Sequence, residues 1–160
     1  MKVGILADTH IRRGRKLPKL VWETLSEVDL ILHAGDIVSV SFLKELKLLA
    51  PVIAVRGNCD WMIDDLPDKA IFDLEHLKIG LTHGYEGPGK NTPQRALNTF
   101  AKDNVDLIIF GHSHMPYKTY TSGILLFNPG SPTEKRRAEF HSMGIMNLKD
   151  NSFDIQHVFF

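Results

Sequence analysis

Five short apolar runs, each ending at a polar block, recur along the first 114 residues of the chain. Continuous rather than alternating hydrophobicity is typical of strands that are buried on both faces. The runs therefore predict five buried strands with a polar block at the carboxyl end of each. They cover residues 3–7, 30–32, 52–55, 79–81 and 107–110.

Helix-length segments separate these runs. Residues 17–28 and 41–49 place apolar side chains near helical spacing. A third helix is expected over residues 92–101, with Thr92 as its N-cap and Pro93 in its first turn. Strands that alternate with helices predict an α/β fold with mainly parallel strand pairing.

The last third of the chain has a different pattern. Short runs at residues 117–121 and 124–127, and again at 144–148 and 153–158, flank turn-rich connections. These pairs predict antiparallel hairpins that complete the sheets. Because no linker or internal repeat divides the chain, we expect one domain over residues 1–160.

Composition narrows the class of protein. A chain of 160 residues can bury about 70% of its unfolded surface, so neither a metal nor a disulfide is needed merely to fold. Lys+Arg and Asp+Glu number 19 each, and this balance predicts no stable nucleic-acid complex. The single cysteine suits a reducing compartment. The N-terminal apolar stretch is too short for a signal segment or a membrane span. We therefore expect a cytoplasmic protein without membrane association. Its composition is also compatible with a homo-oligomer.

The five polar blocks together supply two carboxylates, four imidazoles and one amide. Open α/β sheets bind ligands at the carboxyl ends of their strands, so one sheet edge could gather all the blocks. Residues two apart in an extended chain point to one face, as we expect for Asp8 with His10 and for His112 with His114. The blocks are Asp8-Thr9-His10, Gly35-Asp36, Gly57-Asn58, His83-Gly84 and Gly111-His112-Ser113-His114.

This mixture of ligand types predicts a metal centre. Nitrogen and oxygen ligands suit manganese, iron, zinc, cobalt or nickel better than calcium or magnesium. Seven candidate ligands exceed the four of one tetrahedral ion, and a shared Asp36 would bridge two ions about 3.5–4 Å apart. Two divalent ions bring more positive charge than Asp8 and Asp36 can neutralise, so the site favours a hydroxide and an anionic substrate such as a phosphate ester.

The ordered blocks resemble the motif series of the calcineurin-like metallophosphoesterases, from residue 8 to about residue 131. The segments 57–60 and 128–131 are similar to those of the small bacterial and archaeal phosphodiesterase branch. The resemblance implies a four-layer α/β/β/α sandwich of two mixed β-sheets flanked by helices. It also implies two ligand sets that share one residue. The first set is Asp8, His10, Asp36 and His114, and the second is Asp36, Asn58, His83 and His112.

From this resemblance we expect a dimetal phosphodiesterase that hydrolyses a small phosphodiester substrate. A hydroxide that bridges the two divalent ions would be the nucleophile, so no covalent intermediate is needed. Manganese is the metal we expect first, with nickel, iron, zinc or cobalt as alternatives.

Cys59 is the main departure from the family pattern. Many relatives have a histidine directly after the Gly-Asn pair, where it assists the leaving oxygen. A neutral thiol, with a reference pKa of about 8.5, is a weaker partner for a developing oxyanion. We therefore expect Cys59 to occupy the catalytic leaving-group position and to confer a preference either for good leaving groups or for substrates that supply their own proton donor. An equally weighted interpretation is a small buried hydrophobic residue.

Other polar residues have simpler interpretations. His33 is expected to be a packed strand-end residue, with support of the metal site as the second interpretation. Asp60, Asp64 and Asp65 are expected to be solvated loop charges, although Asp60 is near enough in sequence to touch the substrate. A basic cluster follows His10 and forms either a solvated loop and helix start or a rim that steers phosphate-bearing substrates. Its members are Arg12, Arg13, Arg15, Lys16 and Lys19.

Three other functions compete with the phosphodiesterase hypothesis. A phosphomonoesterase or nucleotidase would use the same site. A non-catalytic protein-interaction scaffold of the same fold is expected to have eroded ligands, whereas all seven positions are present here. A nuclease is less favoured because the chain has no basic excess.

Overall fold

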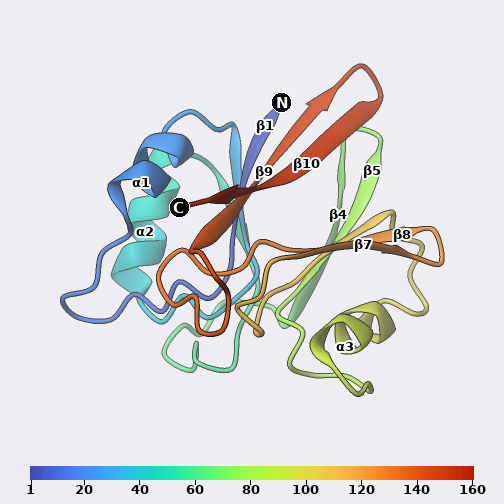
Figure 1. The fold of residues 1–160 in the computed structure, drawn as a ribbon, viewed down its shortest axis with the longest axis horizontal. Helices are drawn as coiled ribbons and strands as arrows, with labels where there is room; N and C mark the ends of the chain where they lie inside the picture. Colours follow the sequence, from blue (N-terminus) through green and yellow to red (C-terminus); the bar gives the residue numbers. More distant parts are fainter.

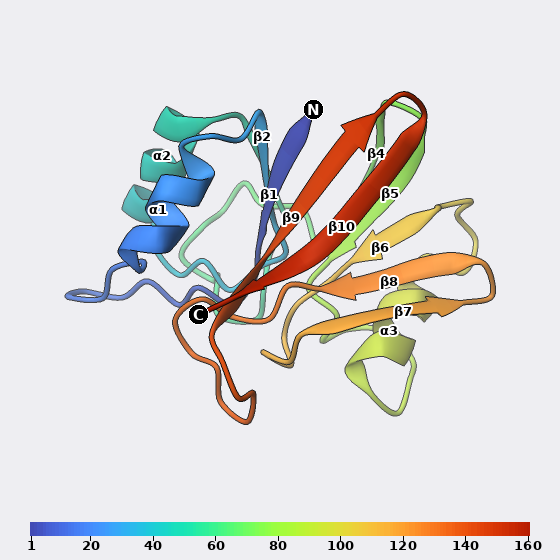
Figure 2. The same ribbon diagram turned by 45° about the horizontal axis from the view of Figure 1, so that its top comes forward.

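Two five-stranded β-sheets stack face to face in the computed structural model, which describes all of residues 1–160 (Figures 1 and 2). The first sheet has the order β10-β9-β1-β2-β3, and the second has the order β4-β5-β6-β8-β7. The strands of the first sheet are β1 (Lys2–Leu6), β2 (Leu30–His33), β3 (Val52–Ala54), β9 (Ser142–Lys149) and β10 (Ser152–Phe159). Those of the second are β4 (Lys69–Leu74), β5 (Leu77–Thr82), β6 (Leu107–Ile109), β7 (Tyr117–Thr121) and β8 (Ile124–Asn128).

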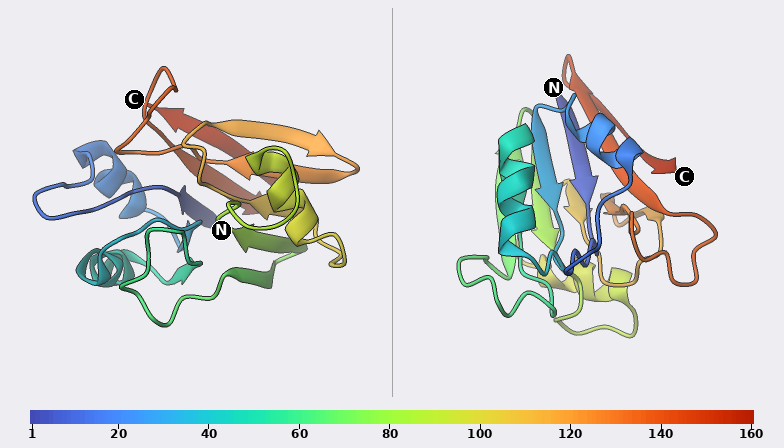
Figure 3. Two further views of the ribbon diagram at one scale, coloured as in Figure 1. Left: turned by 90° about the horizontal axis from the view of Figure 1, so that it is seen from below. Right: turned by 90° about the vertical axis from the view of Figure 1, so that its left-hand side faces the viewer.

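Three helices form the outer layers of the molecule (Figure 3). Helices α1 (Lys19–Leu25) and α2 (Val40–Leu49) pack on the outer face of the first sheet, where they share a core with β1, β2 and β9. Helix α3 (Thr92–Thr99) packs on the second sheet through a smaller core. The predicted four-layer α/β/β/α sandwich is confirmed. None of the three helices is long and apolar enough to cross a membrane.

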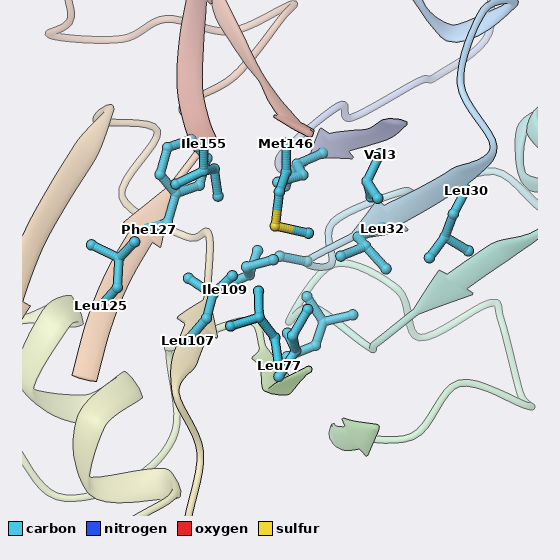
Figure 4. Close-up of a cluster of buried hydrophobic side chains, with 14 of the residues drawn as sticks. Val3, Leu30, Leu32, Leu77, Leu107, Ile109, Leu125, Phe127, Met146 and Ile155 are labelled. Carbon is cyan, nitrogen blue, oxygen red and sulfur yellow. The ribbon is translucent and has the colours of Figure 1, made fainter. Parts of the chain in front are cut away.

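The inner faces of the two sheets meet in the largest hydrophobic core (Figure 4). Adjacent residues of one strand enter different cores. Ile5 packs between the sheets while Leu6 packs under α1 and α2, and Ile109 packs between the sheets while Ile108 packs under α3. A strand between two cores needs apolar residues on both faces, which explains the continuous apolar runs in the sequence.

Strand pairing is mixed, as the resemblance implied, and the two predicted antiparallel hairpins are confirmed as β7/β8 and β9/β10. The expectation of mainly parallel pairing holds only among the five strands predicted from the apolar runs. The pairs β1/β2, β2/β3, β5/β6 and β6/β8 are parallel. The pairs β1/β9, β9/β10, β4/β5 and β7/β8 are antiparallel. Parallel neighbours require a long crossover connection, whereas the short turns between β4 and β5, β7 and β8, and β9 and β10 allow only antiparallel return. The parallel strands therefore occupy the centre of the second sheet, whereas in the first sheet they extend from β1 to the edge strand β3.

Two details of the predicted elements differ from the structure. The N-cap of α3 is Asn91 rather than Thr92, because the Asn91 side chain accepts a hydrogen bond from the Gln94 N–H at 3.0 Å. Strand β4 was not predicted from the sequence. It lies at the edge of the second sheet, and its residues alternate between exposed and half-buried positions. A half-exposed edge strand lacks the continuous apolar run that identified the central strands.

Candidate metal centre

The seven candidate ligands lie in loops that follow five strands of two different sheets. The loops after β1, β2 and β3 carry Asp8, His10, Asp36 and Asn58, and the loops after β5 and β6 carry His83, His112 and His114. The expectation of a single sheet edge was therefore wrong. The stacked sheets direct these strands to the same side of the molecule (Figure 3). There the His83 Nδ1 atom lies 2.7 Å from the Ala34 carbonyl oxygen, a contact between the sheets.

The chain turns sharply at most of these ligand positions. Five of the seven residues have positive φ angles between 41° and 67°. Non-glycine residues rarely adopt this left-handed conformation, and they concentrate at functional sites. Asp8 and His10 do meet, but through a turned rather than an extended backbone, so the reason given for their proximity was wrong. The five residues are Asp8, His10, Asp36, His112 and His114.

Asp36 lies between two groups of ligands. Its Oδ2 atom is 3.3 Å from His10 Nε2 and 3.4 Å from His83 Nε2. One carboxylate oxygen thus faces an imidazole nitrogen of each predicted ligand set. This arrangement fits a carboxylate that is shared by two ions.

Each group is also compact. On one side of Asp36, His114 Nε2 lies 3.5 Å from Asp8 Oδ1, and the rings of His10 and His114 stack with centroids 5.2 Å apart. On the other side, Asn58 Oδ1 lies 3.1 Å from His83 Nε2 and 3.1 Å from His112 Nδ1. The structure therefore brings all seven predicted ligands together, while their role as ligands stays a prediction.

Unpartnered polar atoms show whether these residues fit a metal. Both carboxylate oxygens of Asp8, both ring nitrogens of His10 and the Nε2 atom of His114 are buried without a hydrogen-bond partner. A buried polar atom without a partner costs about 1–3 kcal/mol, and a charged one costs more. These atoms form a three-residue cluster whose potential ligand atoms lie within 4.8 Å of one another. A mixed oxygen and nitrogen donor set of this kind fits a divalent transition metal.

Burial and mutual contacts shift the pKa values of Asp8, Asp36 and His83. Burial raises the pKa of the Asp8 carboxyl to about 7. Burial alone would also raise the pKa of Asp36, but the hydrogen bond and charge of His83 hold it well below its usual range. For His83, burial is outweighed by Asp36 and Asp8, which raise the pKa of its imidazole. His83 Nε2 lies 3.9 Å from Asp8 Oδ1 and 3.4 Å from Asp36 Oδ2, so this imidazole interacts with both carboxylates.

The other imidazoles of the centre favour the neutral state. Burial lowers the pKa of His10 and of His112, and it lowers the pKa of His114 to about 4. A metal ligand must be a neutral imidazole. The His114 Nδ1–H donates to the Glu134 carbonyl oxygen, and this contact leaves Nε2 directed at Asp8. These histidines are therefore prepared for ligation.

Asp60 has a role that the sequence did not predict. It was expected to be a solvated charge, like the exposed Asp64 and Asp65, but it is fully buried. Its carboxylate accepts hydrogen bonds from the backbone N–H groups of Asp36, Val38 and Gly57, at 2.8, 2.7 and 2.8 Å. Asp60 thus fixes the left-handed turn at Asp36. The available signal was its position two residues after the Gly57-Asn58 block.

Gly57 shows how closely this turn is packed. A Cβ atom added at Gly57 would lie 2.2 Å from Asp36 Oδ1 and 2.3 Å from the Asp36 backbone nitrogen. Any side chain there would displace the Asp36 carboxylate. The glycine is required by the approach of this carboxylate to the neighbouring loop.

Two further regions hold the loop after β1. The Ser131 hydroxyl donates to the Asp8 carbonyl oxygen at 2.7 Å, and the Thr133 hydroxyl donates to the Thr9 carbonyl oxygen at 2.6 Å. On the other side, His33 Nε2 lies 3.0 Å from the Thr9 hydroxyl. His33 is fully buried, as expected of a packed strand-end residue, and this contact also fits its second interpretation as support of the site. Thr133 carried no signal in the sequence.

Cys59 lies at the edge of the centre. Its side chain is half-buried, so the interpretation as a buried hydrophobic residue was wrong. Its backbone N–H donates to Asp36 Oδ1 at 2.8 Å, and its sulfur belongs to a cluster with His10 and Asp36. Burial raises the pKa of the Cys59 thiol to about 11, so the thiol is neutral in the metal-free protein. Its part in leaving-group departure stays a prediction.

Residues 1–151 match the calcineurin-like phosphoesterase superfamily domain. The chain belongs to this family of metal-dependent phosphoesterases, and its activity class is that of a phosphoesterase hydrolase. The predicted resemblance is confirmed.

Individual relatives agree with this assignment. The chain is 41% identical over 138 residues to a probable metallophosphoesterase of Methanocaldococcus jannaschii, covering 85% of this chain and 70% of the relative. It is 40% identical over 159 residues to a probable metallophosphoesterase of Methanothermobacter thermautotrophicus, covering 98% and 91%. A phosphodiesterase of M. jannaschii is 31% identical over 147 residues, covering 81% and 83%.

Solved structures share the fold. Vps29 of Chaetomium thermophilum superposes with a TM-score of 0.83 at 19% identity, covering 99% of this chain and 96% of that one. A structure described as a novel archaeal phosphodiesterase gives a TM-score of 0.71 at 22% identity, covering 99% and 100%. At these identities the likeness concerns the fold alone.

Proposed function

We propose that residues 1–160 act as a single metallophosphoesterase domain that hydrolyses small phosphodiesters with two divalent ions. The observation that carries the proposal is the position of Asp36 Oδ2, 3.3 Å from His10 and 3.4 Å from His83. A relative that is named a phosphodiesterase supports the choice of a diester.

The two ligand sets share Asp36. Asp8, His10, Asp36 and His114 would hold one ion, and Asp36, Asn58, His83 and His112 would hold the other. When bound, the ions would supply a water nucleophile of lowered pKa and positive charge for the phosphoryl oxygens. Manganese is proposed first. The mixed donor set also accepts nickel, iron, zinc and cobalt, which are the alternatives.

The protein groups orient the ligands and limit the access of water. Asp36 is fixed by the Cys59 N–H and by the turn that Asp60 holds. Asp8 is fully buried, whereas Asn58 is exposed and His112 is half-buried. The substrate therefore approaches from the side of Asn58 and His112. A neutral Cys59 thiol can donate a hydrogen bond to a leaving oxygen but brings no positive charge, which favours good leaving groups.

The fold alone also suggests a non-catalytic scaffold, because Vps29 structures share it. The seven assembled side chains and the unpartnered atoms of Asp8 weigh against this alternative. A phosphomonoesterase or nucleotidase would need the same centre and differs only in the charge of its substrate.

A substrate panel on metal-reconstituted protein tests the proposal. We expect bis-p-nitrophenyl phosphate to be hydrolysed at least about tenfold more efficiently than p-nitrophenyl phosphate, a difference of about 1.4 kcal/mol in transition-state binding. Chelation should abolish both rates, and manganese should restore them. A preference for the monoester would indicate a nucleotidase. Absence of both metal binding and hydrolysis would favour the scaffold. Cyclic nucleotides and phospholipid-derived diesters extend the panel.

A further inference from the structure

Two cavities with basic walls flank the candidate centre. The larger, of about 550 Å³, is lined by residues of the basic cluster that follows His10, together with Trp22 and Phe42. The smaller, of about 440 Å³, is lined by Ser113, Met115, Arg136 and Arg137. Both volumes are within the range of small-ligand sites. Hydrolysis at the metal centre uses neither cavity.

The larger cavity is partly neutralised by acidic groups. Glu45 belongs to its wall, and Arg15 forms an ion pair with Glu134. Glu45 and Glu134 therefore offset part of the positive charge of the four basic residues that line this cavity.

The smaller cavity adjoins the centre directly. Its Ser113 is the residue between His112 and His114. Its Arg136 lies two residues after Glu134, whose carbonyl oxygen accepts the His114 Nδ1–H. The same segment is joined to the first polar block by the hydroxyls of Ser131 and Thr133. The wall of this cavity and the centre are thus parts of one hydrogen-bonded unit.

Arg136 is held in an uncommon conformation and has no partner. Its φ angle is 47°, in the left-handed region that costs an ordinary residue about 1–2 kcal/mol. Its guanidinium forms none of the ion pairs or side-chain hydrogen bonds of the molecule, in contrast to that of Arg15. Its charge is therefore free to meet an anion in the cavity that it lines with Ser113.

Ser113 adds a hydrogen-bond donor to the cavity. Its Oγ atom accepts hydrogen bonds from the Met115 N–H at 3.2 Å and from Asn128 Nδ2 at 3.1 Å. Both lone pairs are then occupied, so the hydroxyl hydrogen is available to a ligand acceptor. Met115, which is 40% exposed, offers an apolar contact beside it.

We propose that this cavity is a subsite for a second phosphate group of the substrate, bound by Arg136 with Ser113 and Arg137. The inference rests on the proposed phosphodiesterase function and specifies its substrate class as diesters that carry an additional phosphate. The planar guanidinium of arginine matches phosphate oxygens in a bidentate geometry. The wall includes no acidic residue that would oppose this anion.

Two substrates with one scissile bond test the subsite. They are the p-nitrophenyl ester of thymidine 5′-phosphate and the same ester with a 3′-phosphate. We expect the wild type to prefer the 3′-phosphorylated ester by about tenfold in kcat/KM, through a lower KM, because the added contact is present before the transition state. Arg136→Gln should remove this preference, and Arg137→Gln should reduce it. Arg13→Gln, in the larger cavity, is the matched control and should leave the ratio between the two substrates unchanged.

Two results would contradict the subsite, and a third would assign it to the larger cavity. A wild type without the preference, or an Arg136→Gln variant that keeps it, contradicts the proposal. Loss of the preference in Arg13→Gln instead would assign the phosphate to the larger cavity. If the wild type hydrolyses neither ester, the proposed function fails separately. In that case, calorimetry with thymidine 3′,5′-bisphosphate tests the subsite on the metal-free protein. If the subsite exists, Arg136→Gln should bind this compound at least about tenfold more weakly than the wild type.

Discussion

The two sheets make unequal contributions to the centre. The loops of the first sheet supply both carboxylates, the amide and one imidazole, whereas the loops of the second sheet supply three imidazoles. The first sheet holds the Asp36 carboxylate with a backbone N–H donor, that of Cys59. The second sheet orients its imidazoles on carbonyl acceptors, as His114 donates to Glu134. The difference follows from the groups themselves, since a carboxylate accepts and a neutral imidazole donates through one nitrogen.

This comparison shows that neither sheet forms the centre alone. His83 belongs to a loop of the second sheet, yet its Nδ1 contacts Ala34 of the first, and its Nε2 faces Asp36 of the first. The inner core sets the distance between the two halves (Figure 4). A metal that bridges them would bind the folded protein only, so metal binding should add to the free energy of unfolding.

The largest effect is expected where the two halves share a residue. Asp36→Asn removes the negative charge that faces both His10 and His83. Hydrolysis of a diester should fall by about 10³-fold or more, because several kcal/mol of transition-state stabilisation are lost. Steady-state kinetics and metal content by elemental analysis measure this loss. Asp64→Asn, at an exposed position, is the control. Retention of more than about a tenth of the activity would refute the shared role of Asp36.

A smaller effect is expected from the support of the first sheet. Asp60→Ala leaves the N–H groups of Asp36, Val38 and Gly57 without their acceptor. Loss of such outer contacts typically lowers metal affinity or activity by about 10–100-fold. Titration calorimetry with manganese measures the affinity, and Asp65→Ala is the exposed control. Asp60→Asn keeps one acceptor oxygen and should be less impaired. Unchanged affinity in Asp60→Ala would show that the turn at Asp36 is stable without it.

The contributions of Asp8, in a loop of the first sheet, and of His114, in a loop of the second, to the stability of the protein should depend on pH in opposite directions. Burial raises the folded-state pKa of Asp8 from 3.8 to about 7, so the folded protein binds this proton more tightly than the unfolded chain. The resulting stability is lost as pH rises from about 4 to about 7. Burial lowers the pKa of His114 from 6.5 to about 4, so its contribution is lost as pH falls through that range.

Asp8→Asn tests the carboxylate half of this comparison. Without metal at pH 8, the variant should be more stable than the wild type by about 1–3 kcal/mol, because it removes a buried charge without a partner. At pH 4 the two proteins should be nearly equal, and with manganese the order should reverse. Denaturant unfolding measures these differences. Equal stability at pH 8 without metal would mean that Asp8 carries no such cost.

The smallest effect concerns the leaving group. Cys59→His places an imidazole beside Asp36, whose Oδ1 atom accepts the backbone N–H of residue 59. We expect hydrolysis of alkyl diesters to rise by about tenfold, less than the roughly 10²–10⁴-fold typical of an evolved general acid, with little change for aryl diesters. Cys59→Ser is the control for a neutral hydroxyl donor. Equal wild-type rates on matched alkyl and aryl diesters would contradict the proposed dependence on the leaving group.

The central strands and the residues of the centre were readable from the sequence. Strands β1, β2 and β6 lie between two cores, so burial on both faces imposes a continuous apolar run that is visible locally. Strand β4 has only one partner strand and one half-buried face, so it left no comparable pattern. Asp60 and Asp64 are both aspartates of one loop, and only the fold makes the first a buried acceptor and the second an exposed charge.

The sequence by itself determined the class of the molecule: a layered α/β domain whose polar blocks, in a fixed order, carry the ligand types of a metallophosphoesterase. It could do so because side-chain chemistry and two-faced burial are local properties. Only the tertiary structure decided that two sheets, not one edge, converge on Asp36. It also decided that left-handed turns aim the ligands and that Arg136 lies free beside them. Those features depend on contacts between segments far apart in the chain, which no local pattern encodes.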